Sequence, residues 1–173
     1  MLEEEIVKAG AFKMGEFTLA SGRKSDYYVD LRSVTTRPEL LRKVAQAMAK
    51  HIGECDKIAG VELGAVPIAA ALSLETGIPF LMVRKQMKGH GTGRLVEGSM
   101  VPGDKVVFVE DTVTTAGSLV RAINAIREHG GIVERALVIV DREEGATETL
   151  TGIGVSMFSI ASIGKLKQIA SRN

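Results

Sequence analysis

The stretch from Val106 to Ser118 concentrates the side chains best suited to chemistry. A short apolar run, Val106 to Val109, is followed by two adjacent carboxylates, Glu110 and Asp111. The residues after them are mostly small or hydroxyl-bearing, and they are Thr112, Val113, Thr114, Thr115, Ala116, Gly117 and Ser118. Where a strand gives way to a helix, the loop amides and first helical amides lack intrahelical acceptors, and the helix dipole adds partial positive charge. This pattern predicts a cradle for a phosphate group.

Two carboxylates beside a phosphate would repel it unless the ligand also brings hydroxyl donors or a metal cation. A ribose 5-phosphate fits, because its phosphate can lie in the loop while its 2- and 3-hydroxyls donate to Glu110 and Asp111. A magnesium ion on those hydroxyls would reduce the remaining repulsion. The alternative is structural, with the acids ending the strand and Ser118 capping the helix. The complete string favours the ligand site, and it is not a Walker loop because no Gly-Lys-Ser/Thr follows.

Residues 84–94 form a second candidate segment, which is basic and rich in glycine. Its basic side chains are Arg84, Lys85, Lys88, His90 and Arg94, with three glycines among them. The segment is too polar for a core and too rich in glycine for a stable helix or strand, so taken alone it fits a solvated loop. Beside a phosphate site, its cations would stabilise negative charge on the bound ligand and exclude water.

Apolar runs alternate with helical patterns from residue 38 onward. We expect strands at 58–61, 79–83, 106–109, 136–140 and 155–160, and helices at 38–52, about 69–77, about 119–129 and 163–170. The first of these helices has an apolar stripe and ends at Gly53; the stripe is Leu41, Val44, Met48 and Ile52. Continuous apolar runs suggest strands covered on both faces, and the alternation suggests a parallel sheet with right-handed crossovers. Ligands bind beyond the carboxyl ends of such strands.

The N-terminal part lies outside this alternation. It predicts a short acidic helix within residues 1–10 and two strands at 17–19 and 27–31, joined by a turn-rich segment.

Composition narrows the class of protein. The chain has 173 residues, enough for one domain, with 22 Lys and Arg against 21 Asp and Glu. A duplex-binding protein usually carries a basic excess, so we expect no nucleic-acid partner. We also expect no membrane span, because no apolar run is long enough, and the N-terminus lacks the pattern of a secretory signal. The single cysteine, Cys55, excludes an internal disulfide. A cytoplasmic protein fits these features.

The string from 106 to 118 resembles the phosphoribosyl-pyrophosphate signature of type I phosphoribosyltransferases. In that family the acidic pair binds the ribose hydroxyls and the loop binds the 5-phosphate. The resemblance implies an α/β fold with a central, mainly parallel sheet flanked by helices and a small N-terminal hood. We expect one domain over residues 1–173, with the hood at roughly 1–35 and the core at roughly 36–173. Ala116 stands where glycine is frequent in the family, and we expect a negative φ there.

Four further segments extend the resemblance to orotate phosphoribosyltransferases over nearly the full chain. Residues 84–94 resemble the catalytic loop of that family, 141–145 its Asp-Arg-x-Glu-Gly stretch, 17–28 its hood and 62–67 its pyrophosphate loop. The resemblance implies a homodimer in which the basic loop is shared across subunits. Two positions depart from the family pattern, because Ala20 stands where many members carry lysine and Gly64 where some members do.

The resemblance also implies roles for individual residues. The implied catalytic residues are Lys85, Lys88, His90 and Asp111. The implied contacts to phosphoribosyl pyrophosphate are Arg84, Lys85, Lys88, His90, Glu110, Asp111, Thr112, Val113, Thr114, Thr115, Ala116, Gly117 and Ser118. Orotate would be held by Thr114 and Arg142, with tyrosines of the hood flanking the base. No dedicated metal site is implied, because Mg²⁺ would be held mainly through the substrate, near Glu110 and Asp111.

Simpler readings exist for the base-binding residues. Arg142 could form a surface ion pair with a nearby glutamate, and Tyr27 and Tyr28 could serve packing alone.

The implied reaction transfers phosphoribosyl to orotate, forming orotidine 5-phosphate and pyrophosphate in UMP biosynthesis. Two rival functions remain: transfer to a purine or another base, and a non-catalytic regulator that senses phosphoribosyl pyrophosphate and binds nucleic acid.

Overall fold

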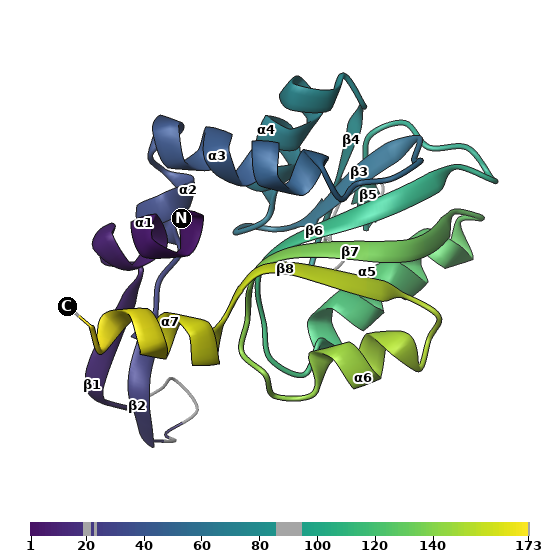
Figure 1. Cartoon of the computed structure of the whole chain (residues 1–173). Coiled ribbons are helices and arrows are strands. Elements are labelled where there is room, and N and C mark those ends of the chain that lie inside the picture. Colours follow the sequence, from purple (N-terminus) through teal and green to yellow (C-terminus); the bar gives the residue numbers. More distant parts are fainter. Residues whose placement is uncertain (19–21, 23, 86–94, 173) are drawn as a thin grey trace.

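The computed structural model describes residues 1–18, 22, 24–85 and 95–172. Its centre is a six-stranded sheet with the order β5-β4-β3-β6-β7-β8 (Figure 1). Five strands run parallel, namely β3 (Lys57–Val61), β4 (Phe80–Val83), β6 (Lys105–Val113), β7 (Ile132–Asp141) and β8 (Ser156–Ser162). The short edge strand β5 (Val96–Glu97) is antiparallel to β4. The predicted α/β fold with a mainly parallel sheet is confirmed.

Both faces of the sheet are covered by helices. Val107 and Val109 of β6 belong to one core, which also contains residues of α3 (Pro38–Ala49) and α4 (Val66–Thr76). Val106 and Phe108 belong to the other core, with α5 (Gly117–Glu128) and α6 (Ala146–Thr151). Figure 1 shows these helix pairs on opposite sides of the sheet. Because strand side chains alternate between faces, burial of both faces explains the continuous apolar runs.

The helix α3 follows its predicted stripe with two differences. Val44 and Met48 are fully buried, as expected, but Leu40 is buried where Leu41 was expected. The helix begins at Pro38, whose missing N–H costs nothing in the first turn. It ends at Ala49, before the predicted end at Gly53.

The N-terminal hood is a separate unit of secondary structure. The strands β1 (Phe12–Thr18) and β2 (Lys24–Val29) pair only with each other, antiparallel, between α1 (Leu2–Lys8) and α2 (Arg32–Thr35). The last helix, α7 (Ile163–Ala170), packs against α1 and β1, so both ends of the chain lie at the hood (Figure 1).

Several elements differ from the sequence predictions, and the short helix α2 and the edge strand β5 were not predicted. The strand β1 begins well before residue 17, and β2 begins before residue 27. Most side chains of β1 are exposed, so no apolar alternation marked its start. The helix α6 was not predicted, because its short sequence contributes only Ala146 and Leu150 to the core. Among the described residues, none of the helices combines the length and apolar character that crossing a bilayer requires.

Candidate active site

The site is created by strands that end at different points. The pairing of β3 with β6 stops at Gly60 and Val109, whereas β6 continues beside β7 as far as Val113 and Asp141. The acidic pair therefore lies within β6, at a point where β3 no longer pairs with it. The sequence had predicted the pair after the end of the strand. A cavity of about 400 Å³ opens there. Its lining includes Glu62, Gly64, Lys85, Glu110, Asp111, Thr112, Val113, Thr114, Thr115, Ala116, Gly117, Ser118 and Arg121.

The helix α5 presents its N-terminus to this cavity. The helix begins at Gly117, and no side chain caps its first turn. Its first amides have no intrahelical acceptor, and together with the positive end of the helix dipole they favour an anion. Thr115 and Ser118 are exposed beside them. The N-terminus of α5 therefore lies at the cavity, where the sequence predicted a phosphate cradle.

The backbone of Ala116 contradicts the sequence expectation. Its φ is +62°, in the left-handed region, so the expected negative φ is wrong. The chain needs this conformation to turn from β6 into α5, which explains why glycine is favoured at this place. The cost for a residue with a Cβ is about 1–2 kcal/mol. Burial of the Ala116 methyl group in the core under α5 offsets part of it.

The carboxylates Glu110 and Asp111 are coupled. The partly buried position of Glu110 raises its pKa to about 8, first through loss of solvent and then through the charge of Asp111, while Lys85 acts in the opposite direction. The amide of Asp111 donates to Glu110 Oε1 at 3.1 Å, and the amide of Thr112 donates to Asp111 Oδ1 at 2.6 Å. The raised pKa of Glu110 indicates that hydroxyl donors or a cation would stabilise the ionised pair.

The acidic pair suits a magnesium ion that takes only some of its ligands from the protein, rather than an ion enclosed by protein ligands. Among the described residues, no group of three or more His, Cys, Asp and Glu side chains could hold a metal ion. Mg²⁺ commonly uses one or two carboxylates and completes its shell with water and substrate oxygens. Glu110 and Asp111 would hold it on the ribose side, where it would reduce the repulsion between the acids and a diphosphate.

After β3, Glu62 and Gly64 line the cavity beside the acids. Gly64 lies so close to Asp111 that a Cβ there would overlap the carboxylate. The carboxylate of Glu62 accepts the backbone N–H of Lys85 at 2.9 Å, which places Lys85 on the same cavity. The peptide bond between Glu62 and Leu63 is cis. A side chain at position 64 would therefore require the carboxylate of Asp111 to move.

The basic segment is only partly described. Lys85 lines the cavity, but the guanidinium of Arg84 is bound to Glu97, with Nε and Nη2 each 3.0 Å from Oε1. Arg84 lines a neighbouring cavity of about 360 Å³. The remaining predicted residues, Lys88 and His90, lie outside the described residues, as does Ala20.

The two residues predicted to hold the base come together. Val113 of β6 lies opposite Asp141 of β7, and the amide of Arg142 donates to the carbonyl of Val113 at 2.9 Å. This register puts Arg142 beside Thr114, which lines the cavity. The Arg142 guanidinium forms the ion pair that a simpler reading suggested, with Nη2 3.1 Å from Glu144 Oε1.

The tyrosines of the hood lie on opposite faces of β2, as neighbours in a strand must. The hydroxyl of Tyr27 accepts from Arg142 Nε at 3.0 Å, while the Tyr27 ring stacks on Phe12 with centroids 5.8 Å apart. Tyr28 packs against Phe17 instead, with centroids 5.5 Å apart. Of the two tyrosines predicted to flank the base, Tyr27 is the one that contacts Arg142.

One lining residue was missed by the sequence reasoning. Arg121 is exposed on α5 and lines both cavities. It follows Gly117 by four residues, so the two share one face of the helix. A basic residue at that spacing from a phosphate loop was the signal that could have identified it.

Comparison with known proteins agrees with this geometry. Residues 30–160 match the family model described as the phosphoribosyl transferase domain. The chain is 49% identical to an orotate phosphoribosyltransferase of Methanothermobacter thermautotrophicus, over 94% of this chain and 90% of the relative. Among solved structures, orotate phosphoribosyltransferase from Aeropyrum pernix superposes with a TM-score of 0.89, at 35% identity, over 100% of this chain and 99% of that one.

A third similar structure carries a ligand. It is orotate phosphoribosyltransferase from Mycobacterium tuberculosis in complex with 5-phospho-alpha-D-ribosyl 1-diphosphate, with a TM-score of 0.80 and 31% identity over 96% of this chain and 99% of that one. The cavity between β3, β6 and α5, the family match and these similarities agree: the chain belongs to the phosphoribosyltransferase family, within its group of orotate phosphoribosyltransferases.

Proposed function

We propose that the protein transfers the 5-phosphoribosyl group from phosphoribosyl pyrophosphate to N1 of orotate, giving orotidine 5-phosphate and pyrophosphate for UMP synthesis. The observation that carries this proposal is the cavity in which Glu110 and Asp111 face the uncapped N-terminus of α5. A ribose 5-phosphate would place its phosphate at the helix and its hydroxyls at the acids.

The reaction breaks the bond between C1 of the ribose and the pyrophosphate oxygen and forms a bond from C1 to N1 of orotate. Positive charge develops on the ribose ring as the leaving group departs, and the acidic pair, Glu110 and Asp111, would stabilise it. Orotate can react as its anion, so the proton of N1 is lost before transfer and no strong general base is needed. Lys85 would stabilise the pyrophosphate from the cavity wall.

The base would bind between the ends of β6 and β7, at Thr114 and Arg142. Arg142 can form a planar contact with a carboxylate, which orotate carries and the common purines lack. The position of Arg142 beside Thr114 therefore favours orotate over a purine. The similarity to orotate phosphoribosyltransferases, one of them in complex with 5-phospho-alpha-D-ribosyl 1-diphosphate, supports the same choice of substrates.

Further parts of the proposal come from the family. Mg²⁺ would act near Glu110 and Asp111, held mainly through the substrate. The protein would work in the cytoplasm as a homodimer, with residues 84–94 closing over the site of the neighbouring subunit, where Lys88 and His90 would contact the pyrophosphate.

The direct test follows the loss of orotate absorbance with phosphoribosyl pyrophosphate, with and without Mg²⁺. We expect turnover that requires the metal and that is much faster with orotate than with adenine, guanine or hypoxanthine. A rate with orotate no higher than with the purines would overturn the base assignment. Binding of phosphoribosyl pyrophosphate without transfer to any base would instead favour a regulator.

A further inference from the structure

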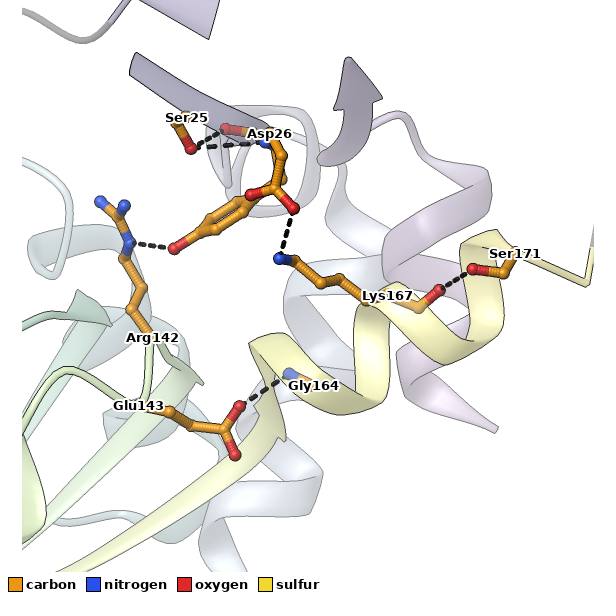
Figure 2. A network of polar contacts seen from close by, with 8 residues as sticks. Ser25, Asp26, Arg142, Glu143, Gly164, Lys167 and Ser171 are labelled. Atoms are coloured by element: carbon orange, nitrogen blue, oxygen red, sulfur yellow. Dashed lines mark hydrogen bonds and ion pairs between the residues drawn. The ribbon is translucent and has the colours of Figure 1, made fainter. Parts of the chain in front are cut away.

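Tyr27 connects three parts of the chain that are distant in sequence. Its hydroxyl accepts from Arg142 Nε at 3.0 Å, in the turn after β7. The ammonium of Lys167, on α7, lies 4.9 Å from the centroid of its ring, within the range of a cation–π contact. Lys167 also binds Asp26, the neighbour of Tyr27 on β2, at 2.7 Å (Figure 2). Tyr27 thus lies where β2, the turn after β7 and α7 meet.

The contact with Tyr27 determines how Arg142 presents its donors. A guanidinium has five N–H groups in a fixed plane. The Nε–H is donated to the Tyr27 hydroxyl, and Nη2 lies 3.1 Å from Glu144 Oε1 in an ion pair. Because Nε and Nη2 are both held, the guanidinium plane is oriented between Tyr27 and Glu144.

The helix α7 supports this arrangement from the other side. Figure 2 shows Lys167 reaching from α7 to Asp26, and Glu143 accepting the amide of Gly164 at the start of the same helix. The latter contact measures 2.7 Å and ties α7 to the turn that carries Arg142. Asp26 is largely exposed, so its ion pair adds little to global stability. Its effect is on the relative position of β2 and α7.

We propose that Tyr27 is a positioning residue for the recognition of a base carboxylate: its hydroxyl orients the guanidinium of Arg142, and Lys167 fixes its ring and adds a second positive charge nearby. This inference rests on the proposed function, in which Arg142 binds the carboxylate of orotate. It adds α7 to the base site, although that helix carries none of the family motifs.

The test compares two ligands that differ only in the carboxylate, orotidine 5-phosphate and UMP, by titration calorimetry on the full chain. The ratio of their dissociation constants measures carboxylate recognition and does not depend on turnover. We expect Tyr27→Phe, which keeps the ring, to reduce the preference for orotidine 5-phosphate by about five- to tenfold. Binding of phosphoribosyl pyrophosphate should remain unchanged.

A double-mutant cycle separates positioning from a general structural effect. In an Arg142→Ala background, Tyr27→Phe should produce no further loss of the ratio, because it acts through Arg142. Lys167→Met should lower the ratio in the same direction but less. The matched control is Lys43→Met, which removes an ion pair of 2.6 Å with Glu5 far from the base site and should leave the ratio unchanged.

The two hypotheses fail in different ways. If the wild-type protein does not prefer orotidine 5-phosphate and does not use orotate, the proposed function is wrong. If the wild-type protein shows the preference but a folded Tyr27→Phe variant retains it in full, Tyr27 does not position Arg142. An equal loss for orotidine 5-phosphate and UMP would also overturn the inference.

Discussion

Gly64 and Asp111 are in direct contact across the cavity, with no room for a Cβ between them. This contact sets the distance between the loop after β3 and the acidic pair on β6. We expect Gly64→Ala to displace the carboxylate and to reduce kcat/KM roughly 100-fold, since a small misplacement of a reacting group has effects of that size.

Steady-state kinetics with orotate and phosphoribosyl pyrophosphate would check this effect. Gly152→Ala is the matched control, because a Cβ there meets only Glu148 and Thr149 carbonyl oxygens at 3.4 Å, away from the site. Retention of full activity by a folded Gly64→Ala variant would contradict the steric argument.

Ala116→Gly should change stability little, although it removes a left-handed alanine. Relief of the conformation is worth about 1–2 kcal/mol. The greater freedom of glycine in the unfolded chain costs about 0.5–1 kcal/mol, and the lost burial of one methyl about 0.8 kcal/mol. Denaturant unfolding should therefore give a difference within about 1 kcal/mol, with activity retained. A β-branched residue gains no such relief, so Ala116→Val should clearly destabilise the protein. Equal stability of the wild type, Ala116→Gly and Ala116→Val would show that the left-handed conformation is not adopted.

The stability of the free protein should fall as pH rises from about 4.5 to about 8. Folding raises the pKa of Glu110 from 4.5 to about 8, so within this window the folded chain holds a proton that the unfolded chain has released. The slope contributed by one group is at most about 1.4 kcal/mol per pH unit. Glu110→Gln should flatten the slope and stabilise the protein above pH 8, while lowering its activity.

Urea unfolding at several pH values, without magnesium or substrate, measures this slope. Glu128→Gln, on the exposed surface of α5, is the charge control. If Glu110→Gln had the same pH profile as the wild type, the raised pKa would be refuted.

Arg121→Ala should weaken the binding of phosphoribosyl pyrophosphate. The side chain is exposed at the junction of the two cavities, so its contribution is that of a screened charge. We expect KM for phosphoribosyl pyrophosphate to rise roughly three- to tenfold while KM for orotate is little changed. The control variant Arg42→Ala, on the exposed surface of α3, should change neither KM. If Arg121→Ala raised the KM for orotate as well as the KM for phosphoribosyl pyrophosphate, its effect would be structural.

The parts of the site that are local in sequence were predictable. The string from Glu110 to Ser118 lies in one strand, one loop and one helix, so its order fixes its geometry. The pairing of Thr114 with Arg142 was implied by the family resemblance, and the parallel register in which Val113 lies opposite Asp141 agrees with it.

The parts that depend on distant contacts were not predictable. The hydrogen bond between Tyr27 and Arg142 joins residues 115 positions apart in sequence, and the ion pair between Asp26 and Lys167 joins residues 141 positions apart. No periodicity encodes such pairs. The φ of Ala116 was also missed, because the turn into α5 overrides the intrinsic preference of alanine.

The meeting of β2, β7 and α7 around Tyr27 has a consequence for how this scaffold can change. The residues proposed to bind the sugar phosphate lie in one continuous stretch of sequence. The residues proposed to select the base lie on several segments, which can be substituted without changing that stretch. A few replacements near Asp26, Arg142 and Lys167 could therefore retune the accepted base while leaving the rest of the reaction intact. Such a division offers a simple route by which one ancestral enzyme could give rise to relatives with different nucleobases.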